Sequence, residues 1–581
     1  MKNKIVLKVL LTVVCLLAGL SGLHAKTIYY VKEDGVGDGS SWNNASGSIQ
    51  DMIDRAVAGD EVWVAAGTYF PTMQTDADDV RSKTFLMKNG VHLYGSFAGT
   101  ETAIAQREKE NSWAWMFTNQ TFLSGNIDGV QDSWKKTIFG DDWLWIFSGL
   151  DGNCYNVVTC PAEIVDETVL DGFAVRRASG KRGGPLGAGI YNNSGKMLVR
   201  NCEVDFNHGN GIYNIGGTIT GCYIGINIAA ASGILNSRGI VKGCLIEENV
   251  YHDFYEYYAK RAWGGGINNY EGEVSECLII GNHARISTPN DFVALPVPGL
   301  SSLGGGIYNN KGKVDRCYIF DNSTYCYNGS GANGSHYAEA LGGGIHNYGG
   351  EVGNCCIYNN QVVAFARIND NNMDAYASGG GIYNYKIENV DSKAYNLTVV
   401  MNKGGNYNGS GSEKNSITTA TDADIHFEKP SSFIGKATTD QQFDELWDAD
   451  FYLKASSSYI DAGSTDGLPD WIINGGDIDG YPRIHNGKID LGAFEYDGIP
   501  YGIKDLLQTK VTVSFNPVIE SVIVSGLEGN ESLSFYNIDG QLLFSRQATG
   551  ETETIPVGHL ATGVYFVKTN NGQSLKWVKE L

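Results

Sequence analysis

The chain is 581 residues long, carries a formal net charge of -22, and contains 75 glycines and 32 tyrosines. This length excludes a single small domain, and the negative charge argues against nucleic acid as a partner, because phosphate contacts need clustered Lys and Arg. A glycine content this high, without a collagen period, favours a β-rich repeat protein with many turns.

Residues 1–25 are typical of a signal peptide. Lys2 and Lys4 precede an apolar run from Ile5 to Leu20, and Ala25 offers a small residue for cleavage. The run is short for a bilayer span, so a retained membrane anchor is the less favoured alternative. The sequence therefore predicts export and cleavage near Ala25.

An amphipathic helix is predicted within residues 48–59. Ile49, Met52, Ile53 and Ala56 are spaced as one helical face, and Gly59 ends the segment. The next segment, EVWVAAGTYFPT, has the pattern of short strands joined by a turn. We expect the helix to cap the open end of a coil built from such strands.

A repeat with a basic period of about 22 residues extends from about residue 186 to residue 402. Each unit has an isoleucine with an asparagine two residues later, and most units continue with a cysteine and a second asparagine. The isoleucines are Ile190, Ile212, Ile234, Ile267, Ile307, Ile345 and Ile382, and the first asparagines are Asn192, Asn214, Asn236, Asn269, Asn309, Asn347 and Asn384. The cysteines are Cys202, Cys222, Cys244, Cys277, Cys317 and Cys355, and the second asparagines are Asn207, Asn227, Asn249, Asn282, Asn322 and Asn360.

These columns predict a right-handed parallel β-helix over residues 26–498. Period-2 alternation marks short strands with one buried face, and one period suits one turn of a coil whose neighbours lie about 4.8 Å away. Identical residues would then stack along the axis, and stacked asparagine amides can bond from coil to coil. A leucine-rich-repeat horseshoe is the alternative, but no leucine ladder or helical segment follows each strand.

The repeated cysteines are predicted to form a small, buried apolar column. Disulfides between successive coils are an alternative in an oxidising compartment, although stacked strands present poor bridge geometry. No paired Cys-x-x-Cys spacing suggests zinc, so we predict no structural metal in this column.

Four consecutive coils are lengthened at the same point. After Asn249, Asn282, Asn322 and Asn360 they exceed the basic period by 11, 18, 16 and 15 residues. We expect these insertions to emerge on one side as a wall of loops rich in aromatic residues. Aromatic rings stack well on sugars, and the ligand-binding residues we predict are Tyr255, Tyr257, Trp263, Tyr325 and Tyr337. The alternative is that these rings pack on one another and only hold the insertions together.

The end of the coil is predicted in the segment DIDGYPRIHNGKIDLGAFEYDG, which ends at Gly498. Its carboxylates Asp477, Asp479, Asp490 and Glu495 could bind calcium, but an Arg483–carboxylate pair that closes the last coil is favoured. Residues 499–511 are predicted to be a linker, and the alternating strands of residues 512–581 suggest a separate small β-sandwich.

Several motifs resemble known families. The segments YYVKEDGVGDGSSWNNA, GDEVWVAAGTYFPT and YGSFAGTE are similar to the start of pectin-lyase-like β-helix proteins of Bacteroidetes, and the closing segment matches them at Asp479, Gly480, Pro482, Arg483, Asp490, Gly492, Ala493 and Glu495. The tail resembles the C-terminal sorting domain of type IX secretion at Asn516-Pro517, Tyr536-Asn537-Ile538-Asp539-Gly540, Leu560, Gly563-Val564-Tyr565 and Lys576. The resemblance implies the type IX machinery as a partner, and release or attachment at the cell surface.

The fold does not define the chemistry, because a β-helix hosts lyases, hydrolases and adhesins alike. No carboxylate cluster recurs on one strand face, and Leu170-Asp171-Gly172 is interpreted as a turn, with a catalytic acid at Asp171 as the less favoured alternative. We therefore favour a non-catalytic, monomeric surface protein that binds polysaccharide or cell-surface glycan and needs no cofactor, with calcium as the one cofactor considered. A lyase or glycoside hydrolase acting on acidic polysaccharide is the main alternative, and a structural envelope protein is the other.

Overall fold

The chain divides into two compact units, residues 1–502 and 503–581. The computed structural model describes residues 26–110, 113–139, 142–180, 187–229, 232–254, 261–287, 299–328, 336–366, 373–387, 390–418, 426–431, 433–434, 437, 439–485, 487–496, 512–516, 521–525, 527, 532–537, 542–550, 552–561, 563–569 and 574–579. The predicted signal peptide and linker lie outside these residues.

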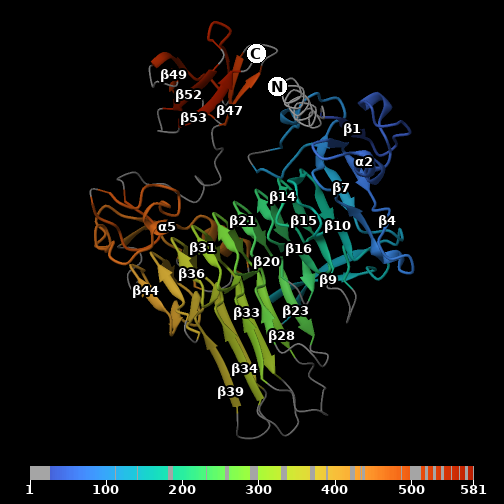
Figure 1. The fold of residues 1–581 in the computed structure, drawn as a ribbon. Helices are drawn as coiled ribbons and strands as arrows, with labels where there is room; N and C mark the ends of the chain where they lie inside the picture. Colours follow the sequence, from blue (N-terminus) through green and yellow to red (C-terminus); the bar gives the residue numbers. More distant parts are fainter. Residues whose placement is uncertain are drawn as a thin grey trace, which may run out of the picture. The chain divides into compact units, whose positions relative to one another are not determined.

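The first unit is a right-handed parallel β-helix, as the sequence predicts, with three sheets along its coils (Figure 1). In the described residues, sheet 1 runs in the order β1 (Ile28–Val31), β2 (Glu61–Ala65), β6 (His92–Phe97), β11 (Thr168–Asp171), β14 (Met197–Arg200), β17 (Thr218–Thr220), β21 (Ile240–Lys242), β26 (Glu273–Ser275), β31 (Lys313–Asp315), β36 (Glu351–Gly353), β41 (Lys393–Tyr395) and β44 (Ser412–Lys414). Sheet 2 contains the repeated isoleucines: β4 (Met73–Gln74), β5 (Lys83–Leu86), β10 (Asn156–Cys160), β13 (Ala188–Asn192), β16 (Asn210–Ile215), β20 (Ile234–Ser237), β25 (Ile267–Tyr270), β30 (Ile307–Asn310), β35 (Ile345–Tyr348), β40 (Ile382–Tyr385) and β43 (Tyr407–Gly409). Sheet 3 follows the cysteines: β3 (Gly67–Tyr69), β7 (Thr121–Ser124), β12 (Ala174–Arg176), β15 (Glu203–Asp205), β18 (Tyr223–Gly225), β22 (Leu245–Glu247), β27 (Leu278–Ile280), β32 (Tyr318–Phe320), β37 (Cys356–Tyr358) and β42 (Thr398–Val400).

The predicted columns stack in register. Ile190 pairs with Ile212, and the same column continues coil by coil to Ile382 with every member fully buried. Two ladders of buried asparagines flank the core. The side-chain Nδ2 of each asparagine donates to Oδ1 of the next one at 2.7–3.0 Å, for example from Asn192 to Asn214 and from Asn282 to Asn322. The ten described cysteines are buried free thiols, so the repeated six form an apolar column in this structure.

The N-terminal end is covered by the predicted helix. Helix α2 (Ile49–Arg55) begins at Ser48, whose hydroxyl accepts a hydrogen bond from the Asp51 backbone N–H at 3.1 Å. Ile49, Met52 and Ile53 are buried in the same cluster as the first coil residues. Further elements of this unit are η1 (Trp42–Asn44), η2 (Val80–Ser82), η3 (Ile104–Gln106), the hairpin β8 (Ser133–Phe139) and β9 (Asp142–Ser148), β45 (Phe427–Lys429), β46 (Asp450–Leu453), α4 (Asp440–Trp447) and α5 (Asp470–Ile473).

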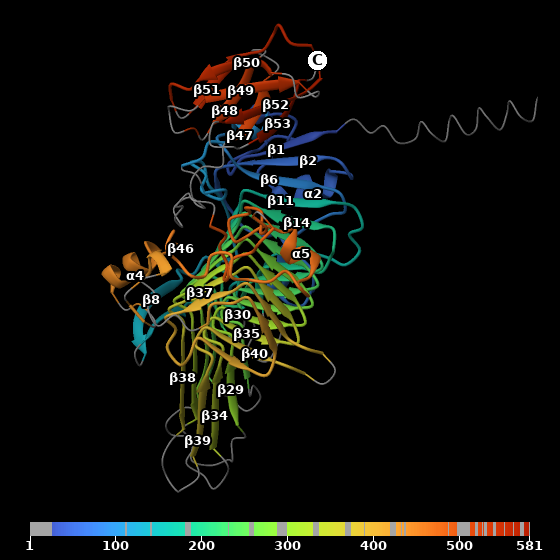
Figure 2. The ribbon, with the colours of Figure 1, turned by 90° about the vertical axis from the view of Figure 1, so that its left-hand side faces the viewer.

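The insertions differ from the predicted wall of loops, because they form two additional parallel sheets, which we call the fin (Figures 1 and 2). Sheet 4 contains β19 (Ile228–Ala229), β23 (Val250–Phe254), β28 (His283–Ser287), β33 (Ser323–Asn328) and β38 (Gln361–Ala366). Sheet 5 contains β24 (Arg261–Trp263), β29 (Leu300–Leu303), β34 (His336–Leu341) and β39 (Met373–Ser378). The insertions leave and rejoin the coil at equivalent points, so their arms pair in register, and small buried residues such as Ala262, Ala284 and Ala340 let the two sheets pack closely.

The last coil is closed by the segment that the sequence singles out. The Arg483 side chain is fully buried, and its Nη2 lies 3.3 Å from Glu495 Oε1 and donates to the Gly492 carbonyl at 3.0 Å. The Asp477 carboxylate accepts backbone N–H groups from Asp479, Tyr481 and Glu495. The favoured Arg483–carboxylate pair is thus present, and the oxygens of the neighbouring Asp477 carboxylate are hydrogen-bonded to backbone N–H groups.

The second unit is a small β-sandwich of two antiparallel sheets in its described residues. One contains β47 (Thr512–Asn516), β48 (Ser521–Ser525) and β51 (Thr552–Pro556), and the other contains β50 (Leu542–Gln547), β49 (Ser532–Asn537), β52 (Gly563–Thr569) and β53 (Ser574–Lys579). The core includes Val522, Phe535 and Trp577.

Candidate glycan-binding surface

A triple-glycine bend joins each arm of sheet 5 to the following strand of sheet 2. The first glycines of the four bends, Gly264, Gly304, Gly342 and Gly379, have φ of 61°, 68°, 66° and 66°, a region that favours glycine. The second glycine has no room for a side chain, since a Cβ at Gly305 would lie 2.3 Å from the Gly343 carbonyl oxygen. The bends therefore turn four successive strands in the same way, so that sheets 5 and 2 meet at a corner.

Strand alternation decides which side chains line this corner. In sheet 5, Ala262, Ser302 and Ala340 are buried toward the fin core, so their immediate neighbours project from the opposite face. In sheet 2 each isoleucine points into the coil, so the next residue projects outward. We call the resulting set the aromatic corner: Trp263, Tyr308, Tyr337, Glu339, His346, Tyr376 and Tyr383.

Rings from the two sheets contact one another in the corner. Trp263 from sheet 5 lies 6.4 Å from Tyr308 of sheet 2, measured between ring centroids. Tyr308, His346 and Tyr383 then stack at 5.3 and 5.5 Å with interplanar angles below 20°. Because these three rings face one another along the coil axis, the partly exposed Tyr308 and Tyr383 present ring edges and hydroxyl groups to the solvent, whereas His346 is buried between them. Burial lowers the pKa of His346 to about 3, so this ring is neutral at pH 7.

Glu339 is held in place by two hydroxyl groups. The Tyr337 hydroxyl donates to Glu339 Oε1 at 2.8 Å, and the Ser301 hydroxyl donates to Oε2 at 3.0 Å. Burial, followed by the hydrogen bond to Glu339, raises the pKa of Tyr337. Burial and the neighbouring Tyr376 raise the pKa of Tyr383 to about 12. Both phenols thus stay protonated, and Tyr337 uses its single O–H to hold the accepting carboxylate in place.

The structure brings together only some of the predicted ligand-binding residues. Trp263 and Tyr337 both lie in the aromatic corner, whereas Tyr255 and Tyr257 lie outside the described residues. Tyr325 belongs to sheet 4, where the Arg285 guanidinium lies 4.3 Å from its ring centroid and Phe365 lies 6.1 Å away. Its neighbours Thr324 and Cys326 are buried, and Cys326 packs in the fin core, so Tyr325 projects from the opposite side of the fin.

Sequence reasoning missed the part of the corner that comes from the coil. Tyr308, His346 and Tyr383 each follow an isoleucine of the repeat, and this recurring aromatic position was the available signal. Glu339 carried no comparable signal, because its role depends on the fold of an insertion.

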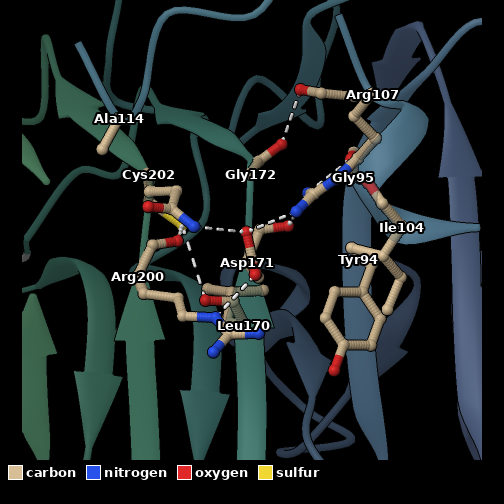
Figure 3. A network of polar contacts seen from close by, with 12 residues as sticks. Tyr94, Gly95, Ile104, Arg107, Ala114, Leu170, Asp171, Gly172, Arg200 and Cys202 are labelled. Carbon is tan, nitrogen blue, oxygen red and sulfur yellow. Dashed lines mark hydrogen bonds and ion pairs between the residues drawn. The ribbon is translucent and has the colours of Figure 1, made fainter. Parts of the chain in front are cut away.

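Asp171 is a second polar centre, and its contacts indicate a structural role (Figure 3). This carboxylate is buried at the end of β11, and it pairs with Arg107 Nη2 at 3.0 Å and with Arg200 Nε at 2.6 Å. Asn201 Nδ2 donates to the same carboxylate at 3.0 Å. Gly172 follows with φ of 80°, so the predicted turn is present, and the acid before it ties sheet 1 to the segment after η3.

The described residues contain no group of three or more His, Cys, Asp or Glu side chains arranged to hold a metal ion. None of their helices is long and apolar enough to span a bilayer.

Several solved structures resemble this chain at low sequence identity. Pectate lyase Pel9A has 15% identity and a TM-score of 0.36, with 82% of this chain and 98% of that chain covered. A rhamnogalacturonan lyase has 11% identity and a TM-score of 0.28, with coverage of 72% and 98%. A tailspike protein of an Acinetobacter baumannii bacteriophage, described as a capsular polysaccharide depolymerase, has 10% identity and a TM-score of 0.25, with coverage of 96% and 78%. No curated protein matches the chain.

The tail gives a specific family match. Residues 508–581 match the family described as the secretion system C-terminal sorting domain, and they contain the sandwich strands described above. The C-terminal unit is therefore a sorting domain of the type IX secretion system, and the protein is a secreted or surface-displayed β-helix protein.

Proposed function

We propose that this protein is a non-catalytic surface protein that binds glycan chains in the aromatic corner. The observation that carries the proposal is the ring contact between Trp263 of the fin and Tyr308 of the coil, with Tyr337 of the fin within electrostatic range of Tyr383 of the coil. Aromatic rings, phenol hydroxyl groups and a carboxylate acceptor on one surface suit sugar rings, which combine apolar faces with many hydroxyl groups.

The length of the corner supports an extended ligand. Its side chains come from four consecutive coils, which at about 4.8 Å per coil gives a surface of roughly 15 Å. Tyr376 is 40% exposed, and Tyr385, stacked on Tyr348 at 5.7 Å beside the corner, is 41% exposed. An oligosaccharide of a few units would fit along this row.

A glycan array probed with the full chain tests the proposal. We expect binding that Trp263→Ala weakens and that Tyr213→Ala leaves unchanged, since Tyr213 holds the equivalent outward position on a coil without a fin sheet 5 arm. Equal binding by both variants, or no binding at all, would contradict it. Parallel assays for unsaturated uronides and reducing ends test the alternative, and product formation would replace binding with cleavage as the function.

A further inference from the structure

We propose that Glu339 restricts the ligand of the aromatic corner to glycans that offer hydroxyl or amino groups there, and that it excludes uronic or sulfated sugars. This inference rests on the proposed glycan-binding function and names the ligand class. This ligand class differs from the acidic polysaccharide that the sequence suggested as the substrate of an enzyme of this fold.

The first step is the hydrogen-bonding capacity of Glu339. A carboxylate accepts about four hydrogen bonds, and Tyr337 and Ser301 supply two here, one on each oxygen. The side chain is only partly buried, so the remaining lone pairs are accessible to a ligand donor. Because Tyr337 and Ser301 fix both oxygens, the acceptor is preorganised, and a sugar hydroxyl can bind without ordering a free side chain.

The second step is charge. A carboxylate or sulfate on the ligand beside Glu339 would face a like charge in a partly desolvated corner, which is costly. Burial and, more weakly, the charge of Glu339 raise the pKa of Tyr383 to about 12, so this phenol is neutral and adds no charge to the corner. The whole chain carries a formal charge of -22, which adds long-range repulsion of polyanions.

The third step concerns Arg261, the cation that shares the column of Glu339. Arg261 pairs with Ser301, and Ser301 pairs with Glu339, so two strand spacings, or roughly 10 Å, separate the two charged positions. The Arg261 side chain is exposed, so solvent screens its charge over this distance, which is about one Debye length. Arg261 therefore compensates only weakly for a sugar acid bound at Glu339.

The test compares binding of the full chain to a neutral β-glucan, to chitosan and to polygalacturonate, using Glu339→Gln and the control Glu271→Gln. Glu271 is an exposed carboxylate on the turn between sheets 2 and 1, so its loss changes net charge equally. We expect the wild type to prefer the first two polymers over polygalacturonate by at least about tenfold, and Glu339→Gln to reduce that preference by about tenfold. Glu271→Gln should leave it unchanged, and added salt should improve the weak binding of polygalacturonate to the wild type.

Equal or tighter binding of polygalacturonate, or an unchanged preference in Glu339→Gln, would overturn the inference while leaving glycan binding intact. Absence of binding to every polymer would overturn the proposed function itself. If Glu339→Gln fails to fold, Tyr337→Phe removes one fixing hydrogen bond without changing charge. That variant should weaken neutral glucan binding severalfold, and unaltered binding would count against the preorganised acceptor.

Discussion

The side-chain amide of Asn309 donates to Oδ1 of Asn347 on the next coil at 2.8 Å. The same amide donates to the Gly312 carbonyl at 3.0 Å, and Oδ1 of Asn309 accepts from Asn269 at 2.8 Å. Each asparagine of the ladder thus closes its own turn and joins two coils. The neighbouring Asn310 lies outside the ladder and is partly exposed.

Asn309→Ala should destabilise the coil far more than Asn310→Ala. Removing the ladder amide leaves buried partners on both neighbouring coils unpaired, at a cost of about 1–3 kcal/mol for each. Thermal unfolding of the two variants measures the difference. Equal shifts would mean that the ladder contributes little to stability.

Asp171→Asn should also be strongly destabilising, by about 3 kcal/mol, because the Arg107 side chain is only 6% exposed and would lose its charged partner. Asp466→Asn, at an exposed position, is the matched control. Denaturant unfolding of both proteins checks the prediction, and an Asp171 variant as stable as the control would contradict the structural role of this carboxylate.

The closing segment should respond to pH. Burial raises the pKa of Glu495 to about 8, well above the value near 4.3 of an unfolded carboxyl group. The folded state therefore holds this proton more tightly, and the stability it contributes is full at low pH and is lost as pH rises through about 8. Melting temperatures between pH 5 and pH 9 should fall for the wild type and fall less for Glu495→Gln; parallel profiles would refute this assignment.

Removal of residues 503–581 should leave the β-helix folded, since they form a separate compact unit with its own core. In the native host the shortened protein should remain in the periplasm, because the sorting domain is missing. Cell fractionation and thermal unfolding test the two halves of this prediction. Normal surface display of the shortened protein would contradict a sorting role for the tail.

The coil could be predicted because its columns repeat at fixed spacing, so Ile212 and Asn214 can be aligned with their equivalents by eye. The fin could not, because its arms differ in length and mix residue types: the register partners Tyr251, Ala284, Thr324 and Val362 share no side-chain chemistry. Only pairing with neighbouring arms turns such segments into strands.

The candidate site was predicted in part for the same reason. Trp263 stands directly before a triple-glycine bend, a position that the repeat fixes, and it lies in the aromatic corner. Tyr325 and Tyr337 looked equivalent as aromatic residues of one insertion, but Tyr325 lies on the outer face of sheet 4 and Tyr337 on the outer face of sheet 5, so they project from opposite sides of the fin. The contribution of sheet 2 depends on the corner geometry, which the sequence alone does not specify.

The most direct test of the glycan-binding account is the affinity of one polysaccharide ligand for two double variants of the full chain. Trp263→Ala with Tyr383→Ala removes a ring from each sheet of the corner, whereas Tyr191→Ala with Tyr213→Ala removes a stacked pair, 5.0 Å apart, from coils outside it. Each ring that contacts sugar contributes on the order of 1 kcal/mol, so the corner variant should bind at least about tenfold more weakly, and the control should match the wild type. Equal affinity of both folded variants would contradict the account.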